Sequence, residues 1–244
     1  MKTLKLLIVL MLIPSLAFGG ASTDFNGSTS DVNVGFEIET VISGSGSVSW
    51  WADADQAFNG STTEVWWGGI TNNGQPEFSC QKFSDNNIYC GYAASGNDDR
   101  VTLAASAVNF PQNVWANYTL TWTNTGTTTL YLNGVSIGTK PNTTEQTTNK
   151  NFRWGEQTFN DPTQNWDGQM AYMRIMNRNI PAWEVSENRF RGESFSSGKV
   201  VEHILFSGSG TELDLSGNGR TGTYTSTSAV TTGPPVMFGS GLPL

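Results

Sequence analysis

Two pairs of tryptophans stand beside carboxylates in a spacing that suits sugar binding: SVSWWAD at 47–53 and TEVWWGG at 63–69. Because successive side chains of a strand point to opposite faces, Trp51 is predicted beside Asp53, and Trp66 beside Glu64, on polar faces. An exposed indole stacks on the C–H face of a pyranose, while carboxylates accept hydrogen bonds from its hydroxyls. Trp51→Ala and Trp66→Ala are then expected to weaken glycan binding and leave the melting temperature nearly unchanged. The alternative is that both indoles lie under loops or under the C-terminal segment, since tryptophan is usually well buried.

A second candidate is a calcium site in the sequence DLSGNG, where Asp214, Ser216 and Asn218 place hard oxygen atoms on a glycine-rich turn. Oxygen atoms of this kind are the ligands that Ca²⁺ prefers. Two other oxygen-rich loops offer the same chemistry, although Asp and Asn also favour turns for backbone reasons alone. These loops contain Asp53, Asp55 and Asn59 in the first case and Asn97 to Asp99 in the second.

Catalytic groups are sparse. Glu37 and Glu39 in FEIETV share one face of a predicted strand. A polar strand face accounts for this spacing as well as a catalytic pair does. His203 is the single histidine, and no Ser or Cys has an identifiable base that would make it a nucleophile. The sequence therefore predicts a protein without catalytic activity of its own.

The two cysteines lie ten residues apart in FSCQKFSDNNIYCGYA. If Ser84 to Asn86 form a turn, Cys80 and Cys90 face each other on paired strands at a separation that allows a disulfide. A redox or metal pair would need a CxxC spacing or nearby histidines. The predicted disulfide links the two strands of one hairpin.

The N-terminus predicts export. Lys2 and Lys5 precede an apolar run from Leu6 to Ile13, which is typical of a signal peptide over residues 1–19, cleaved near Gly19. The run is too short to span a membrane, and no second hydrophobic span follows. We therefore expect a secreted or periplasmic protein without membrane insertion.

The charge balance excludes polyanionic partners. Of 13 Lys and Arg residues two lie in the signal peptide, which leaves 11 against 21 acidic residues and a net charge near −10. Such a surface repels the phosphates of nucleic acids and anionic lipids. Only 14% of residues are charged, and 27 are glycine. Together with the abundance of Ser, Thr and Asn, this composition is typical of exported all-β proteins.

Short alternating segments separated by Gly, Asn and Ser clusters recur along the chain, which predicts an all-β sandwich of two antiparallel sheets. In ANYTLTWT the residues Tyr118, Leu120 and Trp122 share an apolar face. The following TLYLNGVSIGT predicts a hairpin around Asn133-Gly134, the pair preferred in a type I′ turn, with Leu130, Leu132, Val135 and Ile137 on one face. One short helix is predicted near 181–190, beginning at Pro181.

Several of these segments resemble those of a known protein family. NVWANYTLTWTNTGTTTLYLNGVSIGT, FRWGEQ and NWDGQMAYMRIMNRNIPAWEV resemble the laminin G-like domains of the concanavalin A-like lectin/glucanase superfamily. The resemblance implies a jelly-roll β-sandwich over residues 20–191. DFNGSTSDVNVG and DLSGNG match further elements, but DLSGNG follows the helix here, whereas it precedes the sandwich in many relatives. Residues 192–244 are predicted to pack on the same domain, with a truncated second module as the alternative.

The resemblance also bears on function. It implies a concave outer sheet face where sugars lie, and often a structural Ca²⁺, yet Met170, Ala171 and Tyr172 stand where relatives carry Ile-Asp-Glu. Glucanases of the group carry E-x-D-x-x-E, and here Val41 and Ile42 replace its end. We therefore predict a secreted, non-catalytic module that binds glycans or cell-surface ligands. The alternatives are a structural or adhesive protein of an extracellular assembly or virion, with protein partners, and a divergent polysaccharide hydrolase or lyase.

Overall fold

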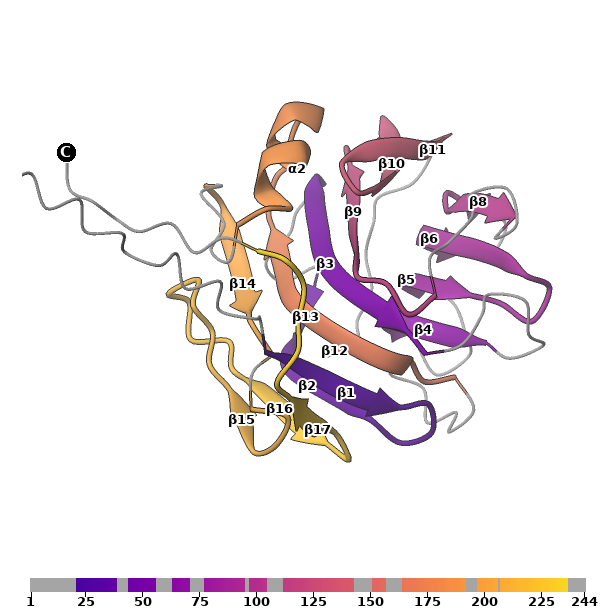
Figure 1. The fold of residues 1–244 in the computed structure, drawn as a ribbon. Coiled ribbons are helices and arrows are strands. Elements are labelled where there is room, and N and C mark those ends of the chain that lie inside the picture. The colour runs from indigo at the N-terminus through magenta and orange to yellow at the C-terminus, as the bar shows by residue number, and fades with distance from the viewer. Residues whose placement is uncertain are drawn as a thin grey trace, which may run out of the picture.

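In a computed structural model, the protein consists of two antiparallel β-sheets packed face to face (Figure 1). The predicted signal peptide and Glu39 lie outside the described residues. The residues that the structure describes are 21–38, 44–55, 63–70, 77–94, 97–104, 112–142, 151–156, 164–191, 197–205 and 207–236.

The first sheet, here called sheet A, has eight strands. Seven follow one another across the sheet, and an eighth, β14 (Lys199–His203), pairs with β13. The order of the seven is β11 (Val135–Pro141), β10 (Thr127–Leu132), β9 (Ala116–Trp122), β3 (Gly46–Ala54), β13 (Asp167–Met176), β1 (Ser22–Asn26) and β17 (Ser228–Val230).

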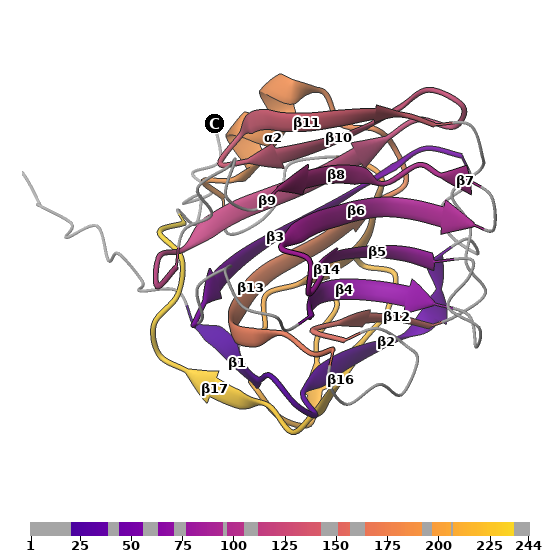
Figure 2. The same ribbon diagram turned by 90° about the vertical axis from the view of Figure 1, so that its right-hand side faces the viewer.

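The second sheet, sheet B, has nine strands and faces the viewer in Figure 2. Eight follow one another, and β8 (Val101–Ala104) pairs with β6. Their order is β15 (Thr211–Glu212), β16 (Gly222–Thr225), β2 (Asp31–Glu37), β12 (Asn151–Trp154), β4 (Glu64–Ile70), β5 (Glu77–Lys82), β6 (Asn87–Ala94) and β7 (Asn97–Asp98). The predicted sandwich of two antiparallel sheets is confirmed.

Aromatic side chains fill the space between the sheets. Trp50 stacks on Tyr118 with ring centres 5.5 Å apart, and Trp67 packs on Phe78 at 5.1 Å and on Phe152 at 5.4 Å. Each of these rings buries a large apolar area, so the core is a main source of stability. Alternation along β3 and β9 is as predicted, because Trp50 and Tyr118 belong to this core.

The β10–β11 hairpin has the predicted turn, since Asn133 and Gly134 have φ angles of 49° and 82°. Leu130 is in the core. The prediction for Val135 is wrong, because its side chain is 67% exposed at the tip of the hairpin. The register of β10 and β11 shifts between Leu130 and Tyr131, so the apolar alternation does not continue across the turn.

The described residues contain one α-helix, α2 (Ala182–Asn188), which begins after Pro181 as predicted. It packs Val185 against Met176 and Ile180, with Tyr131 at the edge of this small cluster. No helix in the described ranges is long and apolar enough to cross a membrane.

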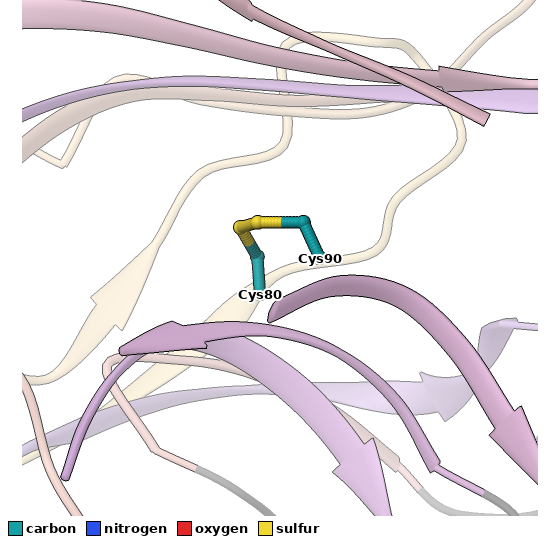
Figure 3. Close-up of a disulfide and its surroundings, with 2 residues drawn as sticks. All are labelled: Cys80 and Cys90. Atoms are coloured by element: carbon teal, nitrogen blue, oxygen red, sulfur yellow. A yellow bond between two sulfur atoms is a disulfide. The ribbon is translucent and has the colours of Figure 1, made fainter. Parts of the chain in front are cut away.

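The predicted disulfide between Cys80 and Cys90 is confirmed. The two residues face each other on β5 and β6 with a Cα–Cα distance of 4.0 Å. Figure 3 shows the bond standing above these two strands, and both residues are fully buried in the core. The crosslink thus joins neighbouring strands of sheet B.

The C-terminal residues contribute to both sheets. β14 pairs with β13 and β17 with β1 in sheet A, while β16 pairs with β2 in sheet B. The strands β14, β16 and β17 are therefore hydrogen-bonded members of these two sheets. In Figure 1 the chain after β17 runs back across sheet A toward α2, and Val236 packs on the outer face of that sheet.

Candidate functional site

Four aspartates gather on the outer face of sheet A, at the end of three neighbouring strands. Asp24 on β1 and Asp53 on β3 both lie opposite Gln169 of β13, one on each side. Asp167 begins β13, and the backbone N–H of Asp55 donates to its carbonyl at 3.3 Å. Since Phe25, Ala52 and Met170 fill the core, alternation turns these four aspartates outward. We call Asp24, Asp53, Asp55 and Asp167 the acidic surface.

The carboxyl groups of the acidic surface influence one another's protonation. Partial burial, together with neighbouring carboxylates, raises the pKa of Asp24, Asp53 and Asp55 above their ordinary values. Asp53 accepts a hydrogen bond from the backbone N–H of Val114, yet its Oδ1 atom is buried and has no hydrogen-bond partner among the described residues. A ligand that donates hydrogen bonds would satisfy these oxygen atoms.

Apolar surface adjoins the acids. Asn113 donates its backbone N–H to the carbonyl of Ala54 at 3.0 Å, and the Gln112 side chain donates to that of Asp55 at 2.9 Å. These bonds hold the segment before β9 against the end of β3. The segment presents Val114, which is 57% exposed, and the half-buried ring of Trp115. Carboxylates beside an accessible aromatic ring make the kind of surface that binds polyhydroxylated ligands.

The predicted exposure of Trp51 is wrong. Trp51 does point to the outer face of sheet A, but it is only 5% exposed. Tyr172, Ile204, Trp115 and Val236 cover its ring, and its Nε1–H donates to the carbonyl of Arg189 at 3.2 Å. Alternation predicted the correct face of the strand for Trp51, and segments distant in the sequence cover its ring on that face.

The predicted exposure of Trp66 is also wrong, for a different reason. Its ring lies in the core, 6.0 Å from Trp50 and 5.2 Å from Tyr118, and it is 1% exposed. The register of β4 against β5 shifts between Val65 and Trp67, so Trp66 is the extra residue of a β-bulge. Both Trp66 and Trp67 therefore turn inward.

Glu64 is on sheet B and 4% exposed, so the structure does not bring it to Asp53 on sheet A. Of the four predicted sugar-binding residues, Asp53 alone lies on the acidic surface. Trp115, Asp24 and Asp167 were missed because they lie far apart in the sequence and meet only through strand pairing.

The predicted calcium ligands form a hydrogen-bonded turn instead. Asp214 Oδ1 accepts from the backbone N–H groups of Glu202 and Ser216 at 3.0 and 2.9 Å. Its Oδ2 accepts from the Ser216 hydroxyl at 2.8 Å and the Arg220 N–H at 2.9 Å. Asn218 directs its amide nitrogen to the carbonyl of Lys199. Hydrogen-bond donors thus surround both carboxylate oxygens of Asp214, and a Ca²⁺ ion at this turn would compete with them.

This turn is expected to be stabilising. Burial acts to raise the pKa of Asp214, but the hydrogen bonds from Glu202, Ser216 and Arg220 outweigh it and hold the pKa below its ordinary value. The carboxylate of Asp214 therefore stabilises the fold at pH values above the pKa of an unfolded Asp, and this stabilisation is lost as the pH falls through the folded pKa. Asp214→Asn should lower the free energy of unfolding by about 1–3 kcal/mol at pH 7 in urea titrations.

The difference between wild type and Asp214→Asn should shrink as the pH falls below about 4, because the wild-type carboxylate is then protonated too. EDTA should not change either melting temperature. A drop in the wild-type melting temperature with EDTA, absent in Asp214→Asn, would contradict this account of the turn.

The other candidate residues form no site in the described ranges. Asp98 pairs with Arg100 at 3.0 Å, Asp99 is buried, and Asn59 lies outside the described residues. Glu37 is half-buried on β2. Within the part of the chain that the structure describes, no group of three or more His, Cys, Asp or Glu residues is placed to hold a metal ion.

His203 is held by hydrogen bonds on both ring nitrogens. Its Nδ1 accepts from the Trp154 indole at 3.2 Å, and its Nε2–H donates to the Arg220 carbonyl at 2.7 Å. Burial lowers the pKa of the imidazole, so the neutral form is favoured. It is the last residue of β14.

Two antiparallel sheets packed over an aromatic core define a β-sandwich. A family model for the concanavalin A-like lectin/glucanase superfamily matches residues 22–186. The chain therefore belongs to the laminin G-like group of that superfamily. No curated protein sequence matches it significantly.

Solved structures are similar in fold. A Bacteroides ovatus protein provisionally assigned to carbohydrate binding is 18% identical with a TM-score of 0.65, and the match covers 89% of this chain and 61% of that one. A heptameric SAP-like pentraxin from Limulus polyphemus is 14% identical with a TM-score of 0.51, over 69% of this chain and 81% of that one. The receptor-binding domain of a botulinum neurotoxin C/D mosaic is 15% identical with a TM-score of 0.52, over 69% and 41%.

Proposed function

We propose that this chain is an exported, non-catalytic module that binds glycans or other cell-surface ligands through the acidic surface and Trp115. The observation that carries the proposal is the buried Asp53 Oδ1, which no described residue hydrogen-bonds, next to the partly exposed aromatic surface of Trp115. Sugar hydroxyls supply the missing donors, and Trp115 supplies a face for the ring.

Three further facts support the proposal. The Bacteroides ovatus protein and the neurotoxin domain are described as binding a carbohydrate and a receptor, respectively. The buried disulfide suits an oxidising compartment outside the cytoplasm, in agreement with the predicted signal peptide. The described acids do not reproduce the glucanase pattern.

Asp53→Asn should weaken glycan binding about tenfold, equivalent to about 1.4 kcal/mol, because a charged acceptor is lost. The melting temperature should not fall, because the substitution relieves repulsion from Asp55. A glycan array run with and without EDTA, followed by calorimetry on the best ligand, measures the effect and also tests the predicted calcium requirement. Glu187→Gln, an exposed acid on α2, is the matched control and should bind as wild type does.

A second candidate is an adhesive protein that uses protein contacts. It is favoured by the burial of Trp51 and Trp66 and by apolar side chains at the surface near α2: Trp183 is 62% exposed and Phe190 41%. If the intact protein binds no sugar with or without EDTA, the glycan proposal fails and this candidate replaces it.

A further inference from the structure

Two carboxyl groups share one guanidinium nitrogen on the outer side of sheet B. Arg153 Nη1 donates to Asp31 Oδ2 at 3.0 Å and to Glu156 Oε2 at 2.9 Å. Asp31 begins β2, Arg153 is in β12, and Glu156 follows β12 by two residues. The adjacent Val32, Phe152 and Trp154 point into the core, so the cluster lies on the opposite face. Figure 2 shows β12 between β2 and β4.

The cluster is largely shielded from solvent. The side chains of Asp31, Glu156 and Arg153 are 4%, 13% and 26% exposed. With one cation between two acids, full ionisation leaves an uncompensated negative charge at a site that water reaches poorly. A buried charge without a partner is costly, whereas a proton on one carboxyl removes the cost.

One atom shows where the proton would lie. Asp31 Oδ1 is buried, and no N–H or O–H group in the described part of the chain donates to it at ordinary hydrogen-bond geometry. The carboxyl of Glu156 is in hydrogen-bonding contact with Asp31, and only a protonated Glu156 can donate to it. The arrangement is that of an acid and a carboxylate held together over a shared arginine.

Among the residues that the structure describes, few other groups act on this pair. Thr225 on β16 lies opposite Asp31 and turns its hydroxyl toward it. Asn165, paired with Glu156 through a β-bridge, is uncharged. The nearest acids along the neighbouring strands are Glu37 at the far end of β2 and Glu64 four residues from the Gly68 that faces Arg153. Within the described ranges, Arg153 and the two carboxyls are therefore the charged groups that determine the local electrostatics.

We propose that Asp31 and Glu156 share a single proton near neutral pH, and that this proton stabilises the contacts of β12 and β16 with β2. Loss of the proton at higher pH places a second negative charge in the cluster. The contacts of β2 with its two neighbouring strands are then weakened. One of these neighbours is β16, which comes from the C-terminal part of the chain.

The direction of the pH effect follows from the titration of Glu156. Burial, with the charge of Asp31 added, raises its pKa to about 7 in spite of Arg153, and burial raises the pKa of Asp31 too. A carboxyl whose folded pKa lies above its unfolded value stabilises the fold below the unfolded pKa, and this stability is lost as the pH rises through about 7. His203 and Asp214 act in the opposite direction, because their lowered pKa values remove stability as the pH falls.

The direct test is a carbon-13 NMR titration of the full-length protein labelled at the glutamate side-chain carboxyls. One glutamate should titrate near pH 7, and its signal should be absent from Glu156→Gln. Asp31→Asn should move that titration to lower pH, because it removes the charge that holds the proton. If every glutamate titrates in the ordinary acid range, the proposal is overturned.

Stability measurements supply an independent test. Between pH 5 and pH 8 the wild type should lose roughly 5 °C of melting temperature relative to Glu156→Gln. Hydrogen exchange at the amides of β16, corrected for the intrinsic rate, should speed up over the same range only in the wild type. Glu187→Gln should behave as the wild type. An identical pH profile for wild type and Glu156→Gln would contradict the proposal.

Discussion

Trp66→Ala is expected to destabilise the protein by about 3–5 kcal/mol and to lower its melting temperature by roughly 10 °C or more. Its ring is fully enclosed between the sheets, with Trp50, Tyr118 and Trp166 within 6.0 Å. Alanine would leave a cavity that these large rings cannot fill without leaving their preferred rotamers.

Trp183→Ala is the matched control, because it removes the same side chain from the exposed face of α2. It should change the free energy of unfolding by less than about 1 kcal/mol. Urea titrations with circular dichroism measure both variants. Equal and small effects would show that Trp66 is not a core residue and would restore its predicted place on an exposed face.

The second large effect is expected at Arg174, which is fully buried. Its Nε–H donates to Glu202 at 2.9 Å, and its two other nitrogens donate to the carbonyls of Asn188 and Arg191. It thus joins β13, β14 and the end of α2. Arg174→Leu should cost about 3–5 kcal/mol, because Glu202 would remain buried with less neutralising charge.

A double variant separates charge from packing. Arg174→Leu with Glu202→Leu removes both buried charges, so it should be more stable than Arg174→Leu alone. Arg174→Lys should be destabilised as well, since an ammonium cannot replace the planar fork of donors. Asp98→Asn is the exposed control and should change stability by less than about 1 kcal/mol. If Arg174→Leu were as stable as the double variant, leaving Glu202 buried without Arg174 would carry no cost, and this account of the ion pair would be wrong.

The fold could be predicted from local patterns because alternation and turn chemistry act over a few residues. Val48 and Trp50 alternate with Ser49 in β3, and the apolar pair enters the core. Asn133-Gly134 selects a type I′ turn through the φ angles that both residues adopt. Cys80 and Cys90 meet because the hairpin between them is short and in register.

The candidate site could be predicted only in part. Asp53 was identified, since alternation alone places it outward. The predicted exposure of Trp66 was wrong, because a bulge depends on how β4 pairs with β5 and inverts the face of a single residue. Asp214 has the residue types of a calcium loop, but the N–H groups that occupy its oxygens come from Glu202 and Arg220 after folding.

The sequence by itself determined the all-β class, the hairpin turns, the disulfide and the laminin G-like family, since each depends on residues that are neighbours in the chain. Tertiary structure alone decided which outward side chains meet solvent. Val236 reaches Trp51 from 185 positions further along the chain, and Asp24 meets Asp167 only because β1 pairs with β13. Exposure and charge clustering depend on such long-range pairing, which no local pattern encodes.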